Sequence, residues 1–202
     1  MLQADTTIDL LRHGEPIGGR RYRGQVDDPL SERGWKQMWH AASGSRPWHG
    51  IVSSPLRRCS EFATSLAREL KVEMELDERL KEVGFGDWEG QTGDQLRSRD
   101  PKILSRFYRD PVQNRPQGAE DLDNFRSRVL QAYTSACERY EGRHLLLVAH
   151  AGVIRAIISH ILEAPVGSMY KLSVHTASLT RIRIEKERPP TLVFMGRTRL
   201  QE

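Results

Sequence analysis

The sequence predicts a three-layer α/β/α sandwich with a mostly parallel central sheet. Two patterns lead to this α/β assignment. Short apolar runs alternate with longer segments whose apolar residues recur at helical spacing, an order typical of strand–helix–strand units. One run, residues 145–149, is apolar without interruption, as is typical of a central strand covered by helices on both faces. The length of 202 residues fits one domain over 1–202.

The first half of the chain contains three predicted strands, two helices and one long loop. Ser31 is a favoured N-cap residue, and the apolar positions after it recur at helical spacing. Cys59, Phe62 and Leu66 share one face of the next predicted helix. The expected elements are a strand over 8–11, a Gly- and Arg-rich loop over 14–29, a helix from 31, a strand over 51–53, a helix over 57–70 and a minor strand over 73–76.

The second half begins with a loop and a broken helical stretch. Pro101 and Pro111 interrupt that stretch, because proline cannot continue a helix from its interior. A long amphipathic helix and the apolar run at 145–149 follow. The expected elements are a loop over 82–93, the helical stretch over 93–115, a helix over 121–140, a strand over 145–148, a helix over 153–162 and strands near 179–184 and 192–195.

Composition narrows the class of protein. Hydrophobic residues make up 38% and charged residues 29%, which is typical of a globular protein. A nucleic-acid binder usually carries a concentrated basic stripe, and the net charge is only +4, so no nucleic-acid partner is expected. The longest apolar run is too short to span a membrane, and the first residues lack a signal-peptide pattern. We expect a cytoplasmic monomer or homodimer without a membrane partner.

Two histidines stand just beyond predicted core strands. His13 follows the first strand, and His150 follows the run at 145–149. In open α/β sheets, ligands bind beyond the carboxyl ends of the strands. Gly14 and Gly152 come close behind the histidines, and glycine lets the backbone turn sharply and a ligand approach it. One histidine at a strand end is more often a packing or surface residue, but two in equivalent places favour a functional site.

Four segments stand in a fixed order along the chain. They are Leu11-Arg12-His13-Gly14-Glu15, Ser53-Ser54-Pro55-Leu56-Arg57-Arg58, Leu80-Lys81-Glu82-Val83-Gly84-Phe85-Gly86-Asp87-Trp88-Glu89-Gly90 and Val148-Ala149-His150-Ala151-Gly152-Val153-Ile154-Arg155. In this order they resemble the motifs of the histidine phosphatase superfamily, which includes the cofactor-dependent phosphoglycerate mutases. Residues 116–120, leading into the helix with Arg128, are a weaker match. The resemblance covers roughly residues 8–160.

The resemblance implies a phosphoglycerate mutase-like fold and a role for each matched residue. His13 corresponds to the nucleophile that accepts the phosphoryl group, and His150 to the second catalytic histidine. Glu82 corresponds to the carboxylate that serves as acid and base. Arg12 and Arg58 correspond to the two phosphate-binding arginines, and Gly14 and Ala151 complete the expected phosphate contacts. Ala151 stands where relatives often have glycine, which is a small change.

The same residue types suit phosphoryl transfer on chemical grounds. A phosphomonoester carries close to two negative charges, and its transfer requires positioning and neutralisation of the non-bridging oxygens. Arg12 and Arg58 each offer a planar fork of donors, and His150 adds another donor, so no metal or other cofactor is expected. The positive surroundings also favour a neutral, nucleophilic His13. Glu82 would protonate the leaving alkoxide and then activate water.

Each assignment has an alternative. Asp87 and Glu89 lie near Glu82 in sequence and are the other candidate acids. Glu15 is expected to orient the loop rather than to react. Arg12 and Arg58 are alternatively solvated surface charges, since the chain has 31 lysines and arginines.

The loop over 16–30 carries the best clue to the substrate. It departs from the mutase pattern and resembles the glycine-rich, basic loop of bacterial α-ribazole phosphatases of the cobalamin pathway. Arg21, Arg23 and Gln25 are expected to line the mouth of the pocket, with a solvated basic loop as the alternative. The interval over 91–118 is more compact than in the mutases, which favours hydrolysis. We therefore expect a phosphomonoesterase acting on a small metabolite, with α-ribazole 5′-phosphate as the first candidate substrate.

Three other functions compete with this hypothesis. A sugar-phosphate phosphatase or a phosphoglycerate mutase-like enzyme would keep the family and change the substrate or reaction. A non-catalytic module that binds phosphoproteins would need no nucleophile, yet every matched position is present. A metallohydrolase with His13 and His150 as ligands lacks the ligand spacing of such sites.

Overall fold

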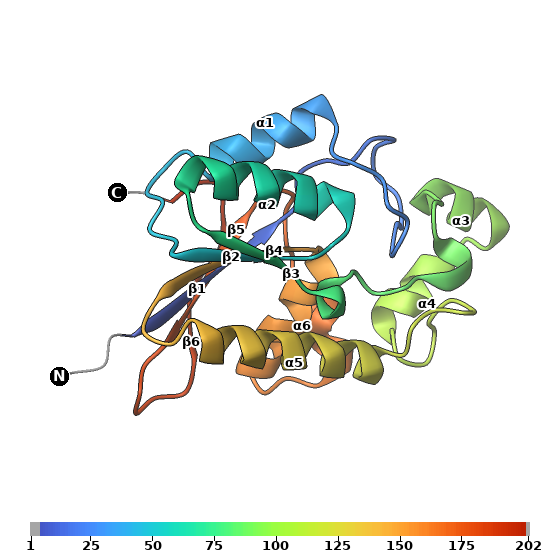
Figure 1. The fold of residues 1–202 in the computed structure, drawn as a ribbon. Coiled ribbons are helices and arrows are strands. Elements are labelled where there is room, and N and C mark those ends of the chain that lie inside the picture. Colours follow the sequence, from blue (N-terminus) through green and yellow to red (C-terminus); the bar gives the residue numbers. More distant parts are fainter. Residues whose placement is uncertain (1–4, 201–202) are drawn as a thin grey trace.

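The computed structural model describes residues 5–200 and confirms the predicted α/β/α arrangement (Figure 1). Helices α1 (Glu32–Ala41) and α2 (Arg57–Leu70) lie on one face of the central sheet. Helices α5 (Leu122–Arg139) and α6 (Ala151–Ile161) lie on the other. The strands are β1 (Thr6–Arg12), β2 (Gly50–Ser53), β3 (Glu73–Leu76), β4 (His144–Ala149), β5 (Leu179–Ile184) and β6 (Thr191–Arg197).

The sheet is mostly parallel, as predicted. Its strand order is β3-β2-β4-β1-β5-β6. The first four strands are parallel, β5 is antiparallel to β1, and β6 is antiparallel to β5. Arg12 at the end of β1 pairs with Ala149, and Ser53 at the end of β2 pairs with Val148. The chain therefore leaves β1, β2 and β4 at the same edge of the sheet, where the predicted site residues follow.

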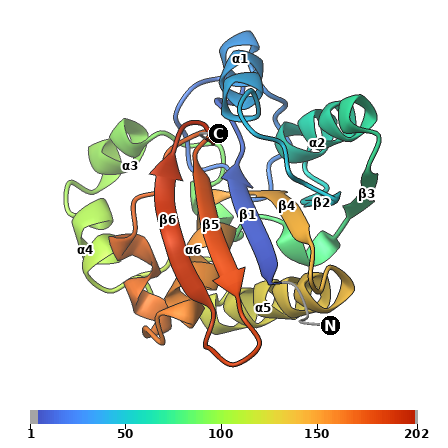
Figure 2. The same cartoon turned by 90° about the vertical axis from the view of Figure 1, so that its left-hand side faces the viewer.

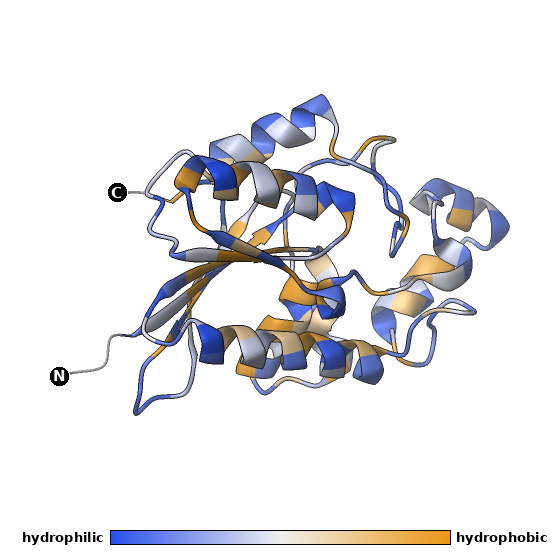
Figure 3. Cartoon of the chain, viewed as in Figure 1, coloured by the Kyte–Doolittle hydropathy of each residue, from blue (hydrophilic) through white to orange (hydrophobic). Residues whose placement is uncertain are grey.

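The apolar run in β4 serves two hydrophobic cores. Leu145 and Leu147 pack into the core beneath α5 and α6, whereas Leu146 and Val148 pack into the core beneath α1 and α2. This division follows from the alternation of side chains along a strand. Helix α6 is apolar over most of its length and lies against the sheet (Figure 3). Burial on both faces explains why β4 contains no alternating polar residues.

Helix boundaries follow local signals, with one informative difference. Ser31 caps α1 as expected, because its side chain accepts a hydrogen bond from the N–H of Gly34 (3.0 Å). The sequence predicts a helix over 153–162 that Gly152 opens. It begins at Ala151, with His150 as its N-cap residue. The second predicted histidine therefore lies at a helix N-terminus.

A small helical unit stands beside the three layers. Helices α3 (Gly93–Arg99) and α4 (Ile103–Arg109) lie to one side of the sheet (Figure 2) and confirm the predicted breaks at the two prolines. They share a separate cluster of buried residues with the short helix η2 (Gly86–Trp88). The cluster consists of Trp88, Leu96, Leu104 and Phe107. Across residues 5–200, no helix combines the length and apolar character that a membrane crossing requires.

A buried carboxylate ties β1 to its neighbours. Asp9 accepts hydrogen bonds from Arg181 Nε (2.7 Å) and Trp48 Nε1 (2.8 Å), and its Oδ2 lies 2.9 Å from His144 Nε2. Burial alone would raise the pKa of Asp9. The hydrogen bonds and charges of His144 and Arg181 outweigh this, so the pKa lies below its ordinary value of 3.8. The ionised carboxylate therefore stabilises the sheet from within.

Replacing Asp9 by alanine is expected to lower the free energy of unfolding by about 3 kcal/mol at neutral pH, because it leaves a partly buried cation uncompensated. The carboxylate is held below its ordinary pKa, so its contribution is present above pH 3.8 and is lost as the pH falls through the lowered value. The difference in free energy of unfolding between wild type and Asp9→Ala should therefore disappear at acidic pH. Urea unfolding at several pH values measures this.

The control is Asp94→Ala, which breaks an ion pair with Arg97. The Asp94 side chain is 91% exposed. Its effect should stay below about 1 kcal/mol at every pH. Equal effects of the two substitutions would contradict a stabilising role for the buried cluster.

Candidate active site

Two histidines meet at the carboxyl edge of the sheet. His13 follows β1 and His150 follows β4; both are buried, and their ring centroids are 5.2 Å apart. The backbone N–H of His13 donates to the Ala149 carbonyl (3.0 Å), so the β1–β4 pairing extends to the histidine itself. Ser54 follows β2 and places its Oγ 2.7 Å from His150 Nε2. The structure thus brings together residues that the sequence placed at equivalent strand ends.

The His13 ring is held in one tautomer. Its Nδ1 lies 2.7 Å from the Gly14 carbonyl oxygen, which can only accept, so Nδ1 carries the proton and Nε2 keeps its lone pair. Burial, followed by the charges of Arg12 and Arg58, holds the pKa of His13 well below its ordinary value of 6.5. The ring is therefore neutral at physiological pH, as the sequence led us to expect, and presents a nucleophilic nitrogen.

The two predicted arginines lie beside the histidines with unused donors. Arg12 Nη1 donates to the Val174 carbonyl (2.6 Å), and Arg58 donates to the carbonyls of Gly24 (2.8 Å) and Val26 (2.7 Å). In both arginines Nε is buried and has no hydrogen-bond partner within residues 5–200. Unpaired buried donors are costly, so two of them at one place indicate an anion-binding site.

The charges of this cluster act on one another. Burial lowers the pKa of Arg12 to about 10, although Glu82 acts in the opposite direction. Burial likewise lowers the pKa of His150 well below 6.5, with Arg58 and His13 as the next contributions. Both imidazoles are therefore neutral, and the fixed positive charge of the site resides on the arginines.

Glu82 lies against the N-terminus of α6. Its Oε2 accepts a hydrogen bond from the Gly152 N–H (3.2 Å), and its Oε1 accepts from the N–H of Val83 (2.9 Å). A Cβ atom at position 152 would lie only 2.2 Å from Glu82 Oε1. The glycine is thus needed for close approach, and the carboxylate lies against the first turn of α6.

Substituting alanine for Gly152 is expected to displace the Glu82 carboxylate and to lower kcat by about 100-fold, since misplacement of a catalytic group by about 1 Å has an effect of this size. Alanine is otherwise favourable in a helix, so the fold should be retained. Steady-state kinetics together with circular dichroism test this. Gly167→Ala is the control, because its Cβ would meet only Val112 Cγ2 at 3.8 Å. Wild-type kcat in Gly152→Ala would contradict a catalytic position for Glu82.

The two loop arginines that were predicted to line the pocket mouth, Arg21 and Arg23, have different surroundings. Arg23 is buried, pairs through Nε with Asp28 (2.9 Å) and donates to the Ile17 carbonyl (2.6 Å). Its charge also helps to lower the pKa of His13, after burial and the charges of Arg12 and Arg58. Arg21 is exposed and donates to the carbonyl of Gly18 (2.9 Å). Arg21 also donates to the Gly90 carbonyl (3.4 Å). Arg23 therefore has a structural role in the loop, whereas Arg21 lies at the protein surface.

Gln25 connects the loop to the segment that carries Glu82. Its Nε2 lies 3.5 Å from the Glu82 carbonyl, and its backbone N–H donates to Glu89 Oε1 (3.1 Å). The same Glu89 oxygen accepts from the N–H of Phe85 (3.0 Å). Glu89 thus joins two loops, and Asp87 is exposed. Of the three candidate acids, Glu82 is the one that lies beside the N-terminus of α6.

The remaining predicted residues shape the turns. Ala151 is the buried first residue of α6. Gly14 packs against α1 so closely that a Cβ would lie 2.3 Å from the Gly34 carbonyl oxygen. Glu15 accepts a hydrogen bond through its backbone carbonyl from the N–H of Ser31 (2.9 Å), which fits its expected role in orienting the loop.

Two neighbours of His150 were not identified from the sequence. Ser54 orients the ring, as described above. The Cys59 thiol lies 3.7 Å from His150 Nε2 and donates to the Ala149 carbonyl (3.4 Å). The place of Ser54 directly after a predicted strand was a usable signal. Cys59 carried none beyond its position on an apolar helical face.

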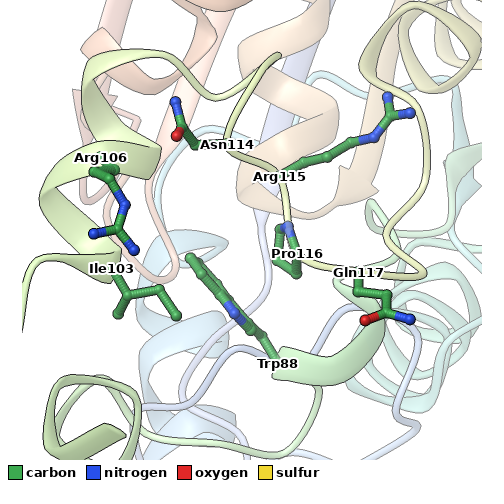
Figure 4. A pocket seen from close by; sticks show the side chains of 7 residues that line it. All are labelled: Trp88, Ile103, Arg106, Asn114, Arg115, Pro116 and Gln117. Atoms are coloured by element: carbon green, nitrogen blue, oxygen red, sulfur yellow. The ribbon is translucent and has the colours of Figure 1, made fainter. Parts of the chain in front are cut away.

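A hollow of about 280 Å³ lies away from the histidines. Trp88 projects into it between α4 and residues 114–117 (Figure 4). Its two arginines already have acidic partners, Arg106 with Asp100 and Arg115 with Asp121. Within residues 5–200, no group of three or more His, Cys, Asp or Glu side chains is arranged to hold a metal ion.

Curated relatives share sequence with most of this chain. The bifunctional protein Rv2228c of Mycobacterium tuberculosis is 36% identical over 180 residues, which cover 87% of this chain and 49% of that protein. The chain thus spans about half the length of that relative. A glucosyl-3-phosphoglycerate phosphatase of the same species is 36% identical over 171 residues, covering 79% of this chain and 76% of the relative.

Solved structures confirm the architecture. YhfR of Bacillus stearothermophilus superposes with a TM-score of 0.85 at 27% identity, over 97% of this chain and 98% of that chain. The α-ribazole phosphatase of Shigella flexneri has a TM-score of 0.83 at 24% identity, over 97% of this chain and 98% of the other, and shows that the fold is shared. The family model of the histidine phosphatase superfamily (branch 1) matches residues 8–197. The chain therefore belongs to the histidine phosphatase superfamily.

Proposed function

We propose that this protein is a metal-independent phosphomonoesterase that acts through a phosphohistidine intermediate on a small phosphorylated metabolite. The observation that carries the proposal is the environment of His13. Its Nδ1 is engaged by the Gly14 carbonyl, which leaves Nε2 free, and the neighbouring Arg12 and Arg58 each bury an unpaired Nε donor. A neutral nucleophile between two guanidinium groups suits attack on a dianionic phosphate.

In the first step, His13 Nε2 attacks the phosphorus atom while the bond from phosphorus to the alcohol oxygen breaks. Glu82 gives its proton to the departing oxygen, and Arg12 and Arg58 neutralise the non-bridging oxygens. In the second step, Glu82 takes a proton from water as the water oxygen attacks phosphohistidine. The phosphorus–nitrogen bond breaks, inorganic phosphate leaves, and His13 regains its lone pair. His150, held by Ser54, contributes a further polar contact on the phosphate side.

The proposed substrate is a monoester of a small metabolite. The basic loop over 16–30 supports α-ribazole 5′-phosphate, because it resembles the loop of phosphatases acting on that compound. The relative named a glucosyl-3-phosphoglycerate phosphatase supports that phosphoglycerate ester as the second candidate. The exposed guanidinium of Arg21 is the loop group proposed to contact the part of the substrate beyond the phosphate.

A panel of phosphomonoesters tests this proposal. Phosphate release should be measured with α-ribazole 5′-phosphate, glucosyl-3-phosphoglycerate, phosphoserine and 3-phosphoglycerate, each with and without EDTA. We expect hydrolysis of at least one ester at an unchanged rate in EDTA. Conversion of 3-phosphoglycerate to its isomer without phosphate release would favour a mutase. Activity lost in EDTA and restored by a divalent cation would favour a metallohydrolase.

A further inference from the structure

Glu82 lies in a segment without regular secondary structure. It follows the short helix η1 (Glu78–Leu80) and precedes η2, and it belongs to neither an α-helix nor a strand. A catalytic group must be held within about 0.5 Å of its productive position. Contacts from outside the segment must therefore fix its backbone.

Arg128 on α5 supplies three of those contacts. Its Nη1 donates to the carbonyl oxygens of Arg79 (2.6 Å) and Lys81 (2.7 Å), and its Nη2 donates to the carbonyl of Glu82 itself (3.1 Å). The guanidinium carbon lies 4.8 Å from the centroid of the Phe125 ring, which packs in the core. The arginine thus binds the chain just before and at the carboxylate residue.

Glu120 completes the arrangement on the other side. Its two carboxylate oxygens accept from Arg128 Nε (2.7 Å) and Nη2 (2.8 Å). Oε2 also accepts from the N–H of Gly84 (3.1 Å), and the backbone N–H of Glu120 donates to the Gly84 carbonyl (2.9 Å). The ion pair therefore holds the backbone on both sides of Glu82, and each charge of the pair compensates the other.

We propose that Arg128 and Glu120 are positioning residues for proton transfer by Glu82, a role that rests on the phosphomonoesterase function proposed above. They fix the backbone so that the Glu82 side chain stays against the Gly152 N–H at the start of α6. Arginine is required, because its planar group of N–H donors bonds the backbone carbonyls of residues 79–82 and the Glu120 carboxylate at the same time. Lysine has a single charged nitrogen on a flexible stem and cannot replace that geometry.

The proposal predicts a dependence on the leaving group. An alkyl phosphate releases a strongly basic alkoxide and needs the proton from Glu82, whereas p-nitrophenyl phosphate releases a stable phenolate and needs it little. The comparison uses kcat/KM, which reports the steps up to release of the alcohol. The later hydrolysis of phosphohistidine, in which Glu82 acts as base for every substrate, does not enter this ratio.

The experiment compares Arg128→Met, Arg128→Lys and Glu120→Gln with wild type. The alkyl substrate is the best ester found in the panel, and the aryl substrate is p-nitrophenyl phosphate. We expect kcat/KM for the alkyl ester to fall by about 30- to 100-fold, with a change of less than about 3-fold for the aryl ester. Arg128→Lys should not restore the alkyl activity. Arg126→Met is the matched control, because Arg126 lies on the same helix and its hydrogen bond within residues 5–200 is a long one to the Ala164 carbonyl (3.4 Å).

Two results would overturn the inference. Equal losses on both esters would show that the pair supports the fold or phosphate binding in general, and unchanged kinetics would show that it is not needed. Glu120→Gln keeps the size of the side chain and serves if the Arg128 variants do not fold, as judged by thermal unfolding. Failure of the proposed function is distinguishable from failure of this inference, because wild type itself would then release no phosphate from either ester. In that case the inference would also be wrong.

Discussion

Replacing His13 by alanine is expected to lower turnover by about four to six orders of magnitude, as is typical when the nucleophile of a covalent mechanism is removed. The structure gives the reason. The His13 ring is fixed by the Gly14 carbonyl and kept neutral by burial, with the nearby arginines as the next causes of its lowered pKa. His150 is also neutral, but Ser54 engages its Nε2 and Cys59 packs against its ring. The second histidine therefore does not substitute for the first.

The direct measurement is a brief reaction with a labelled phosphomonoester, followed by a quench. Phosphohistidine is labile in acid and stable in base, so wild type should carry label after an alkaline quench and His13→Ala should carry none. His160→Ala is the control, since His160 is exposed in the last turn of α6. A wild-type rate of hydrolysis in His13→Ala would refute the mechanism.

Replacing Arg58 by methionine is expected to lower kcat/KM by about 1,000-fold. Loss of one preorganised donor to a developing anion has an effect of this order. Arg58 is fully buried, leaves Nε unpaired and also holds the loop through the carbonyls of Gly24 and Val26. Arg58→Lys keeps the charge and loses the fork, so it should recover only part of the activity.

The same substitution should change the pH profile in a defined direction. Burial and then the charges of Arg12 and Arg58 lower the pKa of His13. Without the Arg58 charge, the pKa of His13 moves up toward 6.5, and the ring becomes protonated at a higher pH. The acid limb of kcat/KM should therefore shift to higher pH, which a series from roughly pH 4 to 9 measures.

Arg57→Met is the matched control for this experiment. Arg57 is the neighbouring residue on α2, is exposed and pairs with Glu61 (2.7 Å). It should leave both kcat/KM and the acid limb unchanged. An acid limb that shifts to lower pH in Arg58→Met, or does not move, would contradict the electrostatic role of Arg58.

The elements that place the histidines were predictable because each has a local signal. An uninterrupted apolar run indicated β4, and Ser31 marked the start of α1. The ends of β1 and β4 then located His13 and His150, since parallel strands end at one edge of a sheet. The order of the motifs added Arg12, Arg58 and Glu82, which the structure brings to that edge.

Other features depend on contacts that local sequence does not encode. Helix α6 begins at Ala151 rather than at the predicted 153, and only the fold shows that the missing Cβ of Gly152 makes room for the Glu82 carboxylate. Asp9 reads as a polar interruption in an apolar strand, and only the fold shows its partners on β4 and β5. Arg23 was expected at the pocket mouth, and its pairing with Asp28 became visible only in three dimensions.

The hydrogen bond between Ser54 and His150 joins residues 96 positions apart, and the bond between Glu82 and Gly152 spans 70 positions. Closing such long loops is slow, because the chain loses conformational entropy before the distant contacts form and stabilise it. During refolding, catalytic activity should therefore return with the late docking of β4 and α6 rather than with early helix formation. We therefore expect the proposed phosphomonoesterase activity to report on complete assembly of this chain, which phosphate release followed during refolding would measure.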